Sequence, residues 1–142
     1  MKGQSEAKVR DALKTMDLRT LVYKLPDDAR NWKPADFAVW WDGGTALIEV
    51  KDTDAVTLWP LRDLRESQRL GILEAEKIGL PYWLVIWWRR ARRWTISDGE
   101  IVLTSPGDGS RSYSWLSSVA GIDCDAGKLP ETLRSVLLGE VD

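Results

Sequence analysis

Three charged residues, Asp36, Glu49 and Lys51, lie inside apolar segments of the chain. The stretch ADFAVWWDGGTALIEVKD (35–52) has the pattern of two strands, at about 35–41 and 45–51, joined by an Asp-Gly-Gly turn. Side chains alternate between the two faces of a strand, so Glu49 and Lys51 share one face of the second strand. The question is whether Asp36, on the first strand, joins them.

The length of the turn decides which residue lies opposite Asp36. A Gly43-Gly44 loop would place Lys51 there, and an Asp42-Gly43 loop would place Glu49 there. In both cases the three charged side chains share one face, with opposite residues about 5 Å apart. A three-residue loop would reverse the parity and separate them.

Two carboxylates and an ammonium at this spacing have a recognisable chemistry. Neighbouring carboxylates repel each other, and a bound divalent cation removes that cost. Mg²⁺ binds through one or two carboxylates together with water and substrate phosphate oxygens. A lysine beside such an ion stabilises a phosphoryl transition state, or orients or deprotonates the attacking water. The alternative is a cross-strand salt bridge at the end of a sheet, with no metal.

The composition excludes several other chemistries. The chain has no histidine, which rules out Ser-His-Asp and Cys-His sites and any nuclease with a histidine base. Its single cysteine, Cys124, forms no internal disulfide and builds no zinc site. No P-loop or dinucleotide fingerprint is present, so we expect no organic cofactor. The absence of a membrane-length apolar run and of a signal-peptide core predicts a cytoplasmic protein without a membrane partner.

Charge is distributed unevenly along the chain. The net charge is −2, but residues 1–94 hold 17 Lys and Arg against 14 Asp and Glu, whereas residues 95–142 hold 3 against 8. This asymmetry is compatible with a basic, nucleic-acid-binding face on the first part. One Asn, two Gln, one Cys and two Met indicate a thermophilic source, because thermolabile side chains are scarce.

The pattern of apolar and turn residues predicts one α/β domain with a mixed central β-sheet flanked by helices. We expect the core at 2–97 and a C-terminal extension at 98–142. A helix between two strands allows a right-handed parallel crossover. The expected helices are at 4–17, 60–79 (beginning at Pro60) and 129–139, and the expected strands are at 19–25, 35–41, 45–51, 82–88 and 92–97, with short strands near 101–104 and 111–116.

The segments PADFAV and LIEVK together resemble the signature of the PD-(D/E)xK nuclease superfamily, which has a restriction-endonuclease-like core. The N-terminal KGQSEAKVRDAL, with an acid on the first helix, is similar to the archaeal-type Holliday junction resolvases. The resemblance covers roughly residues 2–95. It departs from the family at Ala35, where the signature has proline, and in the preceding loop, which lacks the serine of the archaeal enzymes.

The resemblance implies a role for each matching residue. Asp36, Glu49 and the carbonyl of Val50 would bind Mg²⁺, for which Mn²⁺ would substitute. Lys51 would act on the attacking water or the scissile phosphate. Glu6 would be a further ligand, direct or through water; the alternative is an exposed helix acid favoured by the helix dipole. Gln68 would face the site from the following helix, or be a surface polar residue.

The activity implied is a divalent-metal-dependent endonuclease that resolves four-way DNA junctions by paired symmetric cuts. The alternatives are another nuclease of this superfamily acting on duplex or branched DNA, a non-catalytic DNA-binding module, and a purely structural dimeric protein. The basic turn RRARR and further cations are candidate phosphate contacts. They are Lys24, Arg30, Lys33, Arg62, Arg65, Arg69, Arg89, Arg90, Arg92 and Arg93.

Paired cuts require two sites, and one chain carries one set of these residues, so we expect a two-fold symmetric homodimer. The nine tryptophans suggest where the two chains meet, because aromatic residues are enriched in interface cores. In the adjacent pair Trp87-Trp88 one side chain must point away from the core, which makes either an interface candidate. Trp59 is a weaker one.

Overall fold

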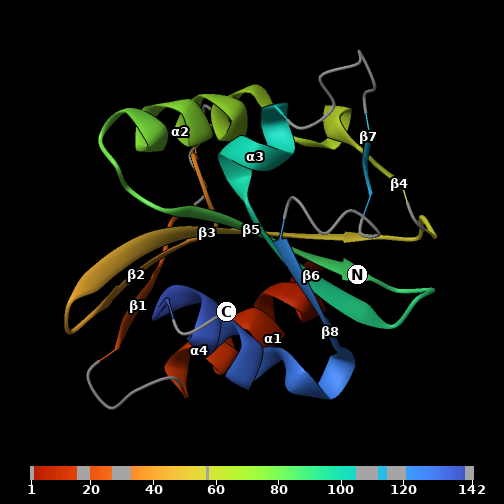
Figure 1. Ribbon diagram of the computed structural model, residues 1–142, viewed down its shortest axis with the longest axis horizontal. Helices are drawn as coiled ribbons and strands as arrows, with labels where there is room; N and C mark the ends of the chain where they lie inside the picture. The colour runs from red at the N-terminus through yellow and green to blue at the C-terminus, as the bar shows by residue number, and fades with distance from the viewer. Residues whose placement is uncertain are drawn as a thin grey trace.

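A mixed six-stranded sheet with the order β1-β2-β3-β5-β6-β8 forms the centre of the molecule (Figure 1). This computed structural model describes residues 2–15, 20–26, 33–56, 58–104, 112–114 and 121–139. The central strands are β1 (Leu21–Lys24), β2 (Phe37–Trp41), β3 (Gly44–Thr53), β5 (Tyr82–Trp88), β6 (Arg93–Asp98) and β8 (Gly121–Asp125). A second sheet pairs β4 (Leu58–Pro60) with β7 (Ser112–Ser114).

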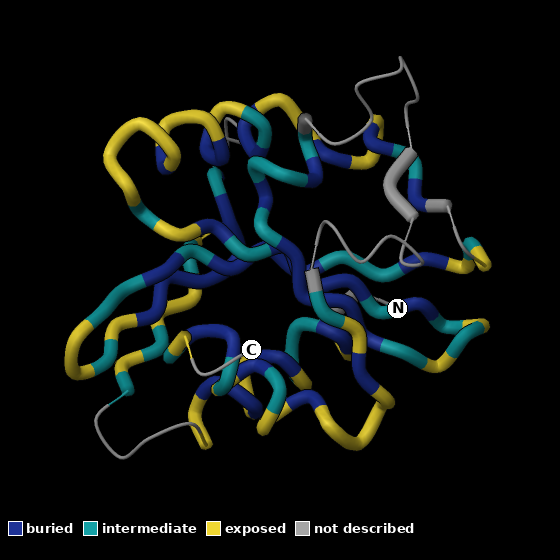
Figure 2. The backbone as a smooth tube through the Cα atoms, viewed as in Figure 1, coloured by how far each residue is buried: buried dark blue, intermediate teal, exposed yellow. Residues whose placement is uncertain are grey.

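Helices cover both faces of the central sheet, which confirms the expected α/β class (Figure 1). Helices α1 (Lys2–Lys14) and α4 (Leu129–Leu137) lie on one face, and α2 (Glu66–Lys77) and α3 (Gly99–Thr104) lie on the other. Each face has its own apolar core: Val9, Ile48 and Leu133 belong to the first, and Ile72 and Leu84 to the second. The inner strands β5 and β6 are mostly buried, whereas the edge strand β1 is mostly exposed (Figure 2).

The hairpin between β2 and β3 has the register expected from an Asp42-Gly43 loop. Trp41 pairs with Gly44 and Phe37 pairs with Ile48 in antiparallel register. Gly43 has a φ of 103°, in the left-handed region that favours glycine. Continuing this register places Asp36 opposite Glu49. The crossover through α2 then brings β5 parallel to β3, as predicted.

The start of one predicted helix and the type of one predicted strand are wrong. The long helix does not begin at Pro60, because residues 61–63 form a 3₁₀ turn and Leu64 is extended, with φ −80° and ψ 120°; α2 begins at Glu66. Residues 101–104 are not a strand but part of α3. Asp98 accepts hydrogen bonds from the backbone N–H of Glu100 (2.9 Å) and of Ile101 (3.2 Å), and this cap starts a helix in a β-branched sequence.

The remaining boundaries agree closely with the pattern where the structure describes them. Strand β5 matches the predicted 82–88, and β6 begins one residue later than expected. Strands β4 and β8 are not among the predicted strands. The ends of the first predicted helix (16 and 17) and of two predicted strands (19, 111, 115 and 116) lie outside the described residues. Within the described part of the chain, no helix is long and apolar enough to cross a membrane.

The tryptophans proposed for an interface are mostly core residues. Trp88 and Trp59 are fully buried on the α2 face, so both assignments are wrong. The indole N–H of Trp88 donates to Thr95 Oγ1 at 3.0 Å. Trp87 is half-buried on the α1 face and packs against Trp94, with 4.9 Å between ring centroids. Helices of this chain therefore cover both faces of the sheet, where the sequence suggested contact with a second chain.

Helix α2 approaches the segment before β2 very closely at Gly71. A Cβ built on Gly71 would lie 2.7 Å from Pro34 Cβ and 3.0 Å from the Pro34 carbonyl oxygen. No side chain larger than hydrogen fits there without movement of the backbone. The absence of a side chain at Gly71 therefore sets how near α2 comes to residues 34–36.

We expect Gly71→Ala to lower the free energy of unfolding by about 1–3 kcal/mol, because overpacking against backbone outweighs the helix propensity that alanine gains. Gly127→Ala is the matched control, since nothing lies within 4 Å of its Cβ position. Urea denaturation measures both variants. A Gly71→Ala protein as stable as the parent would show that this contact is looser than described.

Candidate active site

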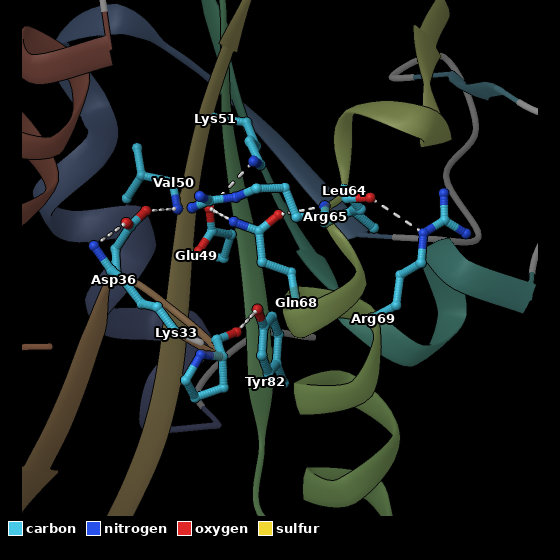
Figure 3. Close-up of polar contacts among 11 residues, drawn as sticks. Lys33, Asp36, Glu49, Val50, Lys51, Leu64, Arg65, Gln68, Arg69 and Tyr82 are labelled. Carbon is cyan, nitrogen blue, oxygen red and sulfur yellow. Dashed lines mark hydrogen bonds and ion pairs between the residues drawn. The ribbon is translucent and has the colours of Figure 1, made fainter. Parts of the chain in front are cut away.

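Asp36 is fully buried and is held by contacts from both its backbone and its side chain (Figure 3). Its N–H donates to Ile48 O at 3.0 Å, and its carbonyl accepts from the N–H of Leu25 at 2.9 Å. Its Oδ2 accepts from the backbone N–H of Val50 at 2.8 Å, and its Oδ1 lies 3.2 Å from Lys33 Nζ. The side chain is therefore fixed against the middle of β3.

Glu49 is also fully buried and lies on the face of β3 that α2 covers. Its Oε2 accepts from Gln68 Nε2 at 2.9 Å and lies 3.5 Å from Lys51 Nζ. The side chain of Lys51 is 11% exposed, so it is the member of this group nearest to solvent on β3. The structure thus places Asp36, Glu49 and Lys51 on one face, with a lysine beside each carboxylate.

Gln68 connects the start of α2 to Glu49. Its Oε1 accepts from the backbone N–H of Arg65 at 2.8 Å, while its Nε2 donates to Glu49 (Figure 3). One amide therefore satisfies an unpaired N–H at the helix N-terminus and fixes a buried carboxylate. Gln68 is a buried residue of the site and not a surface polar residue.

Tyr82 closes the site on the side of β5. Its hydroxyl donates to the carbonyl of Pro34, and so holds the segment that carries Asp36 (Figure 3). Burial, with added repulsion from Glu49 and Asp36, raises the pKa of Tyr82 well above its usual value. The phenol therefore stays protonated and continues to donate over the neutral and mildly alkaline range.

The donor set is one that Mg²⁺ uses. Asp36 and Glu49 are carboxylates on one face, the peptide of Val50 lies between them, and Asp36 Oδ1 accepts no well-formed hydrogen bond among the described residues. One or two carboxylates with a backbone carbonyl leave room for water and phosphate oxygens. Across the described residues no three His, Cys, Asp or Glu side chains gather as a metal group. Glu6 is therefore not gathered with the pair as a direct ligand, and its Oε2 lies 3.4 Å from Lys24 Nζ; a contact with the metal through water stays a prediction.

Comparison with known proteins places this site in a known fold. No protein-family model matches the chain, and no curated protein matches its sequence. Among solved structures the chain is similar to Archaeoglobus fulgidus Hjc, a Holliday junction resolvase from an archaeal hyperthermophile. The TM-score is 0.57 over 95% of this chain and 98% of Hjc, with 13% sequence identity. The two proteins share a fold. It is the restriction-endonuclease-like fold expected from the sequence, and the relationship to Hjc is shown at the level of the fold.

The predicted phosphate contacts fall into four groups. Lys33 is not a surface residue, because it is buried beside Asp36. Arg30 lies outside the described residues. Several others are paired within the chain: Lys24 with Glu6, Arg69 with the carbonyls of Leu61 and Leu64, Arg89 with Asp52 and Asp54, and Arg93 with Asp123 and Asp125. Arg62, Arg65, Arg90 and Arg92 are exposed.

The pairing in the basic turn changes its electrostatics. Hydrogen bonding to Asp54 and the charge of Asp52 raise the pKa of Arg89, and hydrogen bonding to Asp123 raises that of Arg93. Burial alone would raise the pKa of Asp52, but hydrogen bonds, including one from Ser5, and the Arg89 charge outweigh it and lower that pKa. The positive charge of RRARR is therefore largely balanced at its two ends and is uncovered at Arg90 and Arg92.

Sequence reasoning missed two members of the site. The sequence pattern favours Lys33 as a phosphate contact and Tyr82 as part of a buried strand. Nothing in the local pattern distinguishes them, because both depend on how the segment 33–36 packs between β3, β5 and α2. The one available signal for Lys33 is its position three residues before Asp36 in the chain.

Tyr82 gives a prediction about alkaline pH. Its pKa is raised in the folded state, so the stability that the neutral phenol confers is present below about pH 10 and is lost as the pH rises further. We expect the free energy of unfolding to fall above pH 10 with a slope of up to about 1.4 kcal/mol per unit. Tyr82→Phe should remove this slope and lower stability at neutral pH by about 1 kcal/mol.

The control is Tyr23→Phe, because the Tyr23 side chain is 53% exposed. Urea denaturation between pH 8 and 11 compares the two variants with the parent protein. Equal alkaline slopes in all three proteins would contradict the buried, protonated state of Tyr82.

Proposed function

We propose that the protein is a divalent-metal-dependent DNA endonuclease whose active site contains Asp36, Glu49 and Lys51. The observation that carries the proposal is a pair of fully buried carboxylates on one sheet face, each beside a lysine. Burying two anions for stability alone is inefficient, because desolvation offsets most of what their ion pairs contribute. Their occurrence in a fold shared with a Holliday junction resolvase supports a catalytic role.

Each residue of the site has a task in this proposal. Asp36, Glu49 and the carbonyl of Val50 hold Mg²⁺ or Mn²⁺, which supplies charge neutralisation at phosphorus and a more acidic bound water. Lys51, with its ammonium partly open to solvent, orients the attacking water or contacts the scissile phosphate. Gln68 keeps Glu49 in position. Water attacks phosphorus in line and leaves a 5′-phosphate and a 3′-hydroxyl.

The substrate we propose is a four-way DNA junction. The fold shared over 95% of the chain is that of a protein named as a Holliday junction resolvase. Exposed cations lie near the site. Arg90 and Arg92 follow the C-terminal end of β5, which lies beside the end of β3 that follows Lys51. Arg62 and Arg65 lie just before α2. A nuclease of the same fold acting on duplex or otherwise branched DNA is the second candidate.

Substitutions at the site test the proposal. Asp36→Asn, Glu49→Gln and Lys51→Ala should each lower cleavage by at least about 100-fold, because each removes a metal ligand or a charge at the reacting phosphate. Binding of DNA should persist in all three variants. Asp42→Asn, at the exposed turn of the same hairpin, is the matched control and should cleave normally.

Cleavage of a labelled junction and its binding by gel shift are measured in parallel, with circular dichroism to show that each variant is folded. Three folded variants that cleave at the parent rate would rule out this site.

We further propose a homodimer, because two symmetric cuts require two copies of the site. The described residues offer an apolar surface for it at the sheet edge. Leu21 (63% exposed) pairs with Trp40 (44% exposed), and Tyr23 lies on the same face of the edge strand β1. These exposed side chains share one face of the β1–β2 edge, and exposed apolar groups that gather on one face are typical of an interaction site. They replace Trp59 and Trp88, which are buried, as the candidates for the interface.

Sedimentation equilibrium at micromolar concentration tests the dimer. We expect a mass of about twice 16.1 kDa for the parent protein and a shift toward one chain for the double variant Tyr23→Ser, Trp40→Ser. Ile78→Ser, at an exposed apolar residue just after α2, is the control and should remain dimeric. A parent mass of one chain, with and without junction DNA, would remove the dimer.

A further inference from the structure

Lys33 is an unusual residue for this site because its ammonium is withdrawn from water. Its side chain is 6% exposed and its Nζ lies 3.2 Å from Asp36 Oδ1, on a carboxylate that is fully buried. Lysine is among the residues least often buried, and it is buried when it has a charged partner. Lys33 therefore occupies the Asp36 side of the site (Figure 3).

The backbone around Lys33 is fixed on several sides. The next residue, Pro34, accepts a hydrogen bond from the Tyr82 hydroxyl and lies against Gly71 of α2. Asp36 is bonded through its backbone to Ile48 and Leu25. The main chain at Lys33 is therefore anchored close to the site, whereas the four-carbon lysine side chain has rotatable bonds of its own.

The charges of the site balance without a metal. Lys33 lies beside Asp36 and Lys51 lies beside Glu49, so two anions face two cations. A divalent cation bound between the carboxylates would add two positive charges next to two ammonium groups, that of the buried Lys33 and that of the largely covered Lys51. Like charges in a poorly solvated site repel strongly. One ammonium must therefore move away when the metal binds. Lys33 is the candidate, because its Nζ contacts Asp36 Oδ1, an oxygen that we propose as a metal ligand.

We propose that Lys33 is a resident counter-ion that competes with the metal for Asp36, so that Mg²⁺ binds only as Lys33 leaves Oδ1. This rests on the proposed metal site at Asp36 and Glu49. Lys33 is a positioning residue: it keeps the empty site neutral and makes metal binding weaker than the two carboxylates alone would allow. A purely structural partner of Asp36 would have the opposite effect, since its removal would disorder the ligand and weaken metal binding.

Calorimetric titration with Mg²⁺, at fixed pH and without DNA, separates these two roles. We expect Lys33→Met to bind Mg²⁺ about tenfold more tightly than the parent protein, because the competing cation is gone. Lys77→Met is the matched control: Lys77 is an exposed lysine paired with Glu74 on α2, and its loss should leave the affinity unchanged. Unchanged or weaker Mg²⁺ binding by folded Lys33→Met would overturn the proposal.

A second measurement uses the unaltered protein. It tests whether Lys33 leaves Asp36 when Mg²⁺ binds, even if Lys33→Met does not fold. Lysines are acylated with an amine-reactive reagent and the modified peptides are quantified by mass spectrometry, with and without Mg²⁺. We expect Lys33 to be protected in the metal-free protein and to react at least about threefold faster when Mg²⁺ is bound, while Lys77 reacts equally in both. Continued protection of Lys33 at saturating Mg²⁺ would contradict its departure.

The outcomes also separate this inference from the proposed function. If neither the parent protein nor Lys33→Met binds Mg²⁺, or if Asp36→Asn binds it as well as the parent, then the metal site itself is wrong. If the parent binds Mg²⁺ through Asp36 and Lys33→Met shows no gain, then the metal site stands and the competition is wrong.

Discussion

Two carboxylates with no exposed surface, Asp36 and Glu49, impose the main constraint on this fold. A buried ion without partners costs several kcal/mol, so each of the two must be satisfied by the surrounding structure. The partners come from separate elements: the backbone of β3, the segment before β2, and the first turn of α2. The site therefore forms only when the sheet, this segment and the helix have packed together. This packing holds the two carboxylates in position.

Small residues control that packing. Gly43 allows the tight hairpin whose register sets Asp36 opposite Glu49, and Gly71 allows α2 to approach Pro34 until Gln68 reaches Glu49. Tyr82 then ties the same segment to β5. These contacts use backbone groups, the Gln68 amide and a neutral phenol, so they keep the carboxylates in place without adding charge. What remains adjustable is the pair of lysines, whose long side chains end at the carboxylates.

The sequence predicted the parts of the site that follow from strand alternation. Asp36, Glu49 and Lys51 were placed on one face because a period of two and a short turn leave few alternatives. Lys33 escaped prediction because it lies in a polar segment without periodicity, where burial depends on distant partners. Trp59 and Trp88 were misplaced because both belong to a core that includes residues of α2 and α3, and α3 itself depends on the cap at Asp98. Arg89 and Arg93 find acidic partners more than 25 residues away, which no local pattern shows.

The central claim is that these buried carboxylates serve metal-dependent cleavage of branched DNA. The most direct measurement compares a labelled four-way junction, a linear duplex and single strands of the same sequences, each incubated with the protein in Mg²⁺ or in chelator. We expect paired, symmetric cuts in the junction with Mg²⁺, little cleavage of the linear substrates, and none of any substrate in chelator. Cleavage that persists in chelator, or an inert junction that the protein nevertheless binds in Mg²⁺, would contradict the claim.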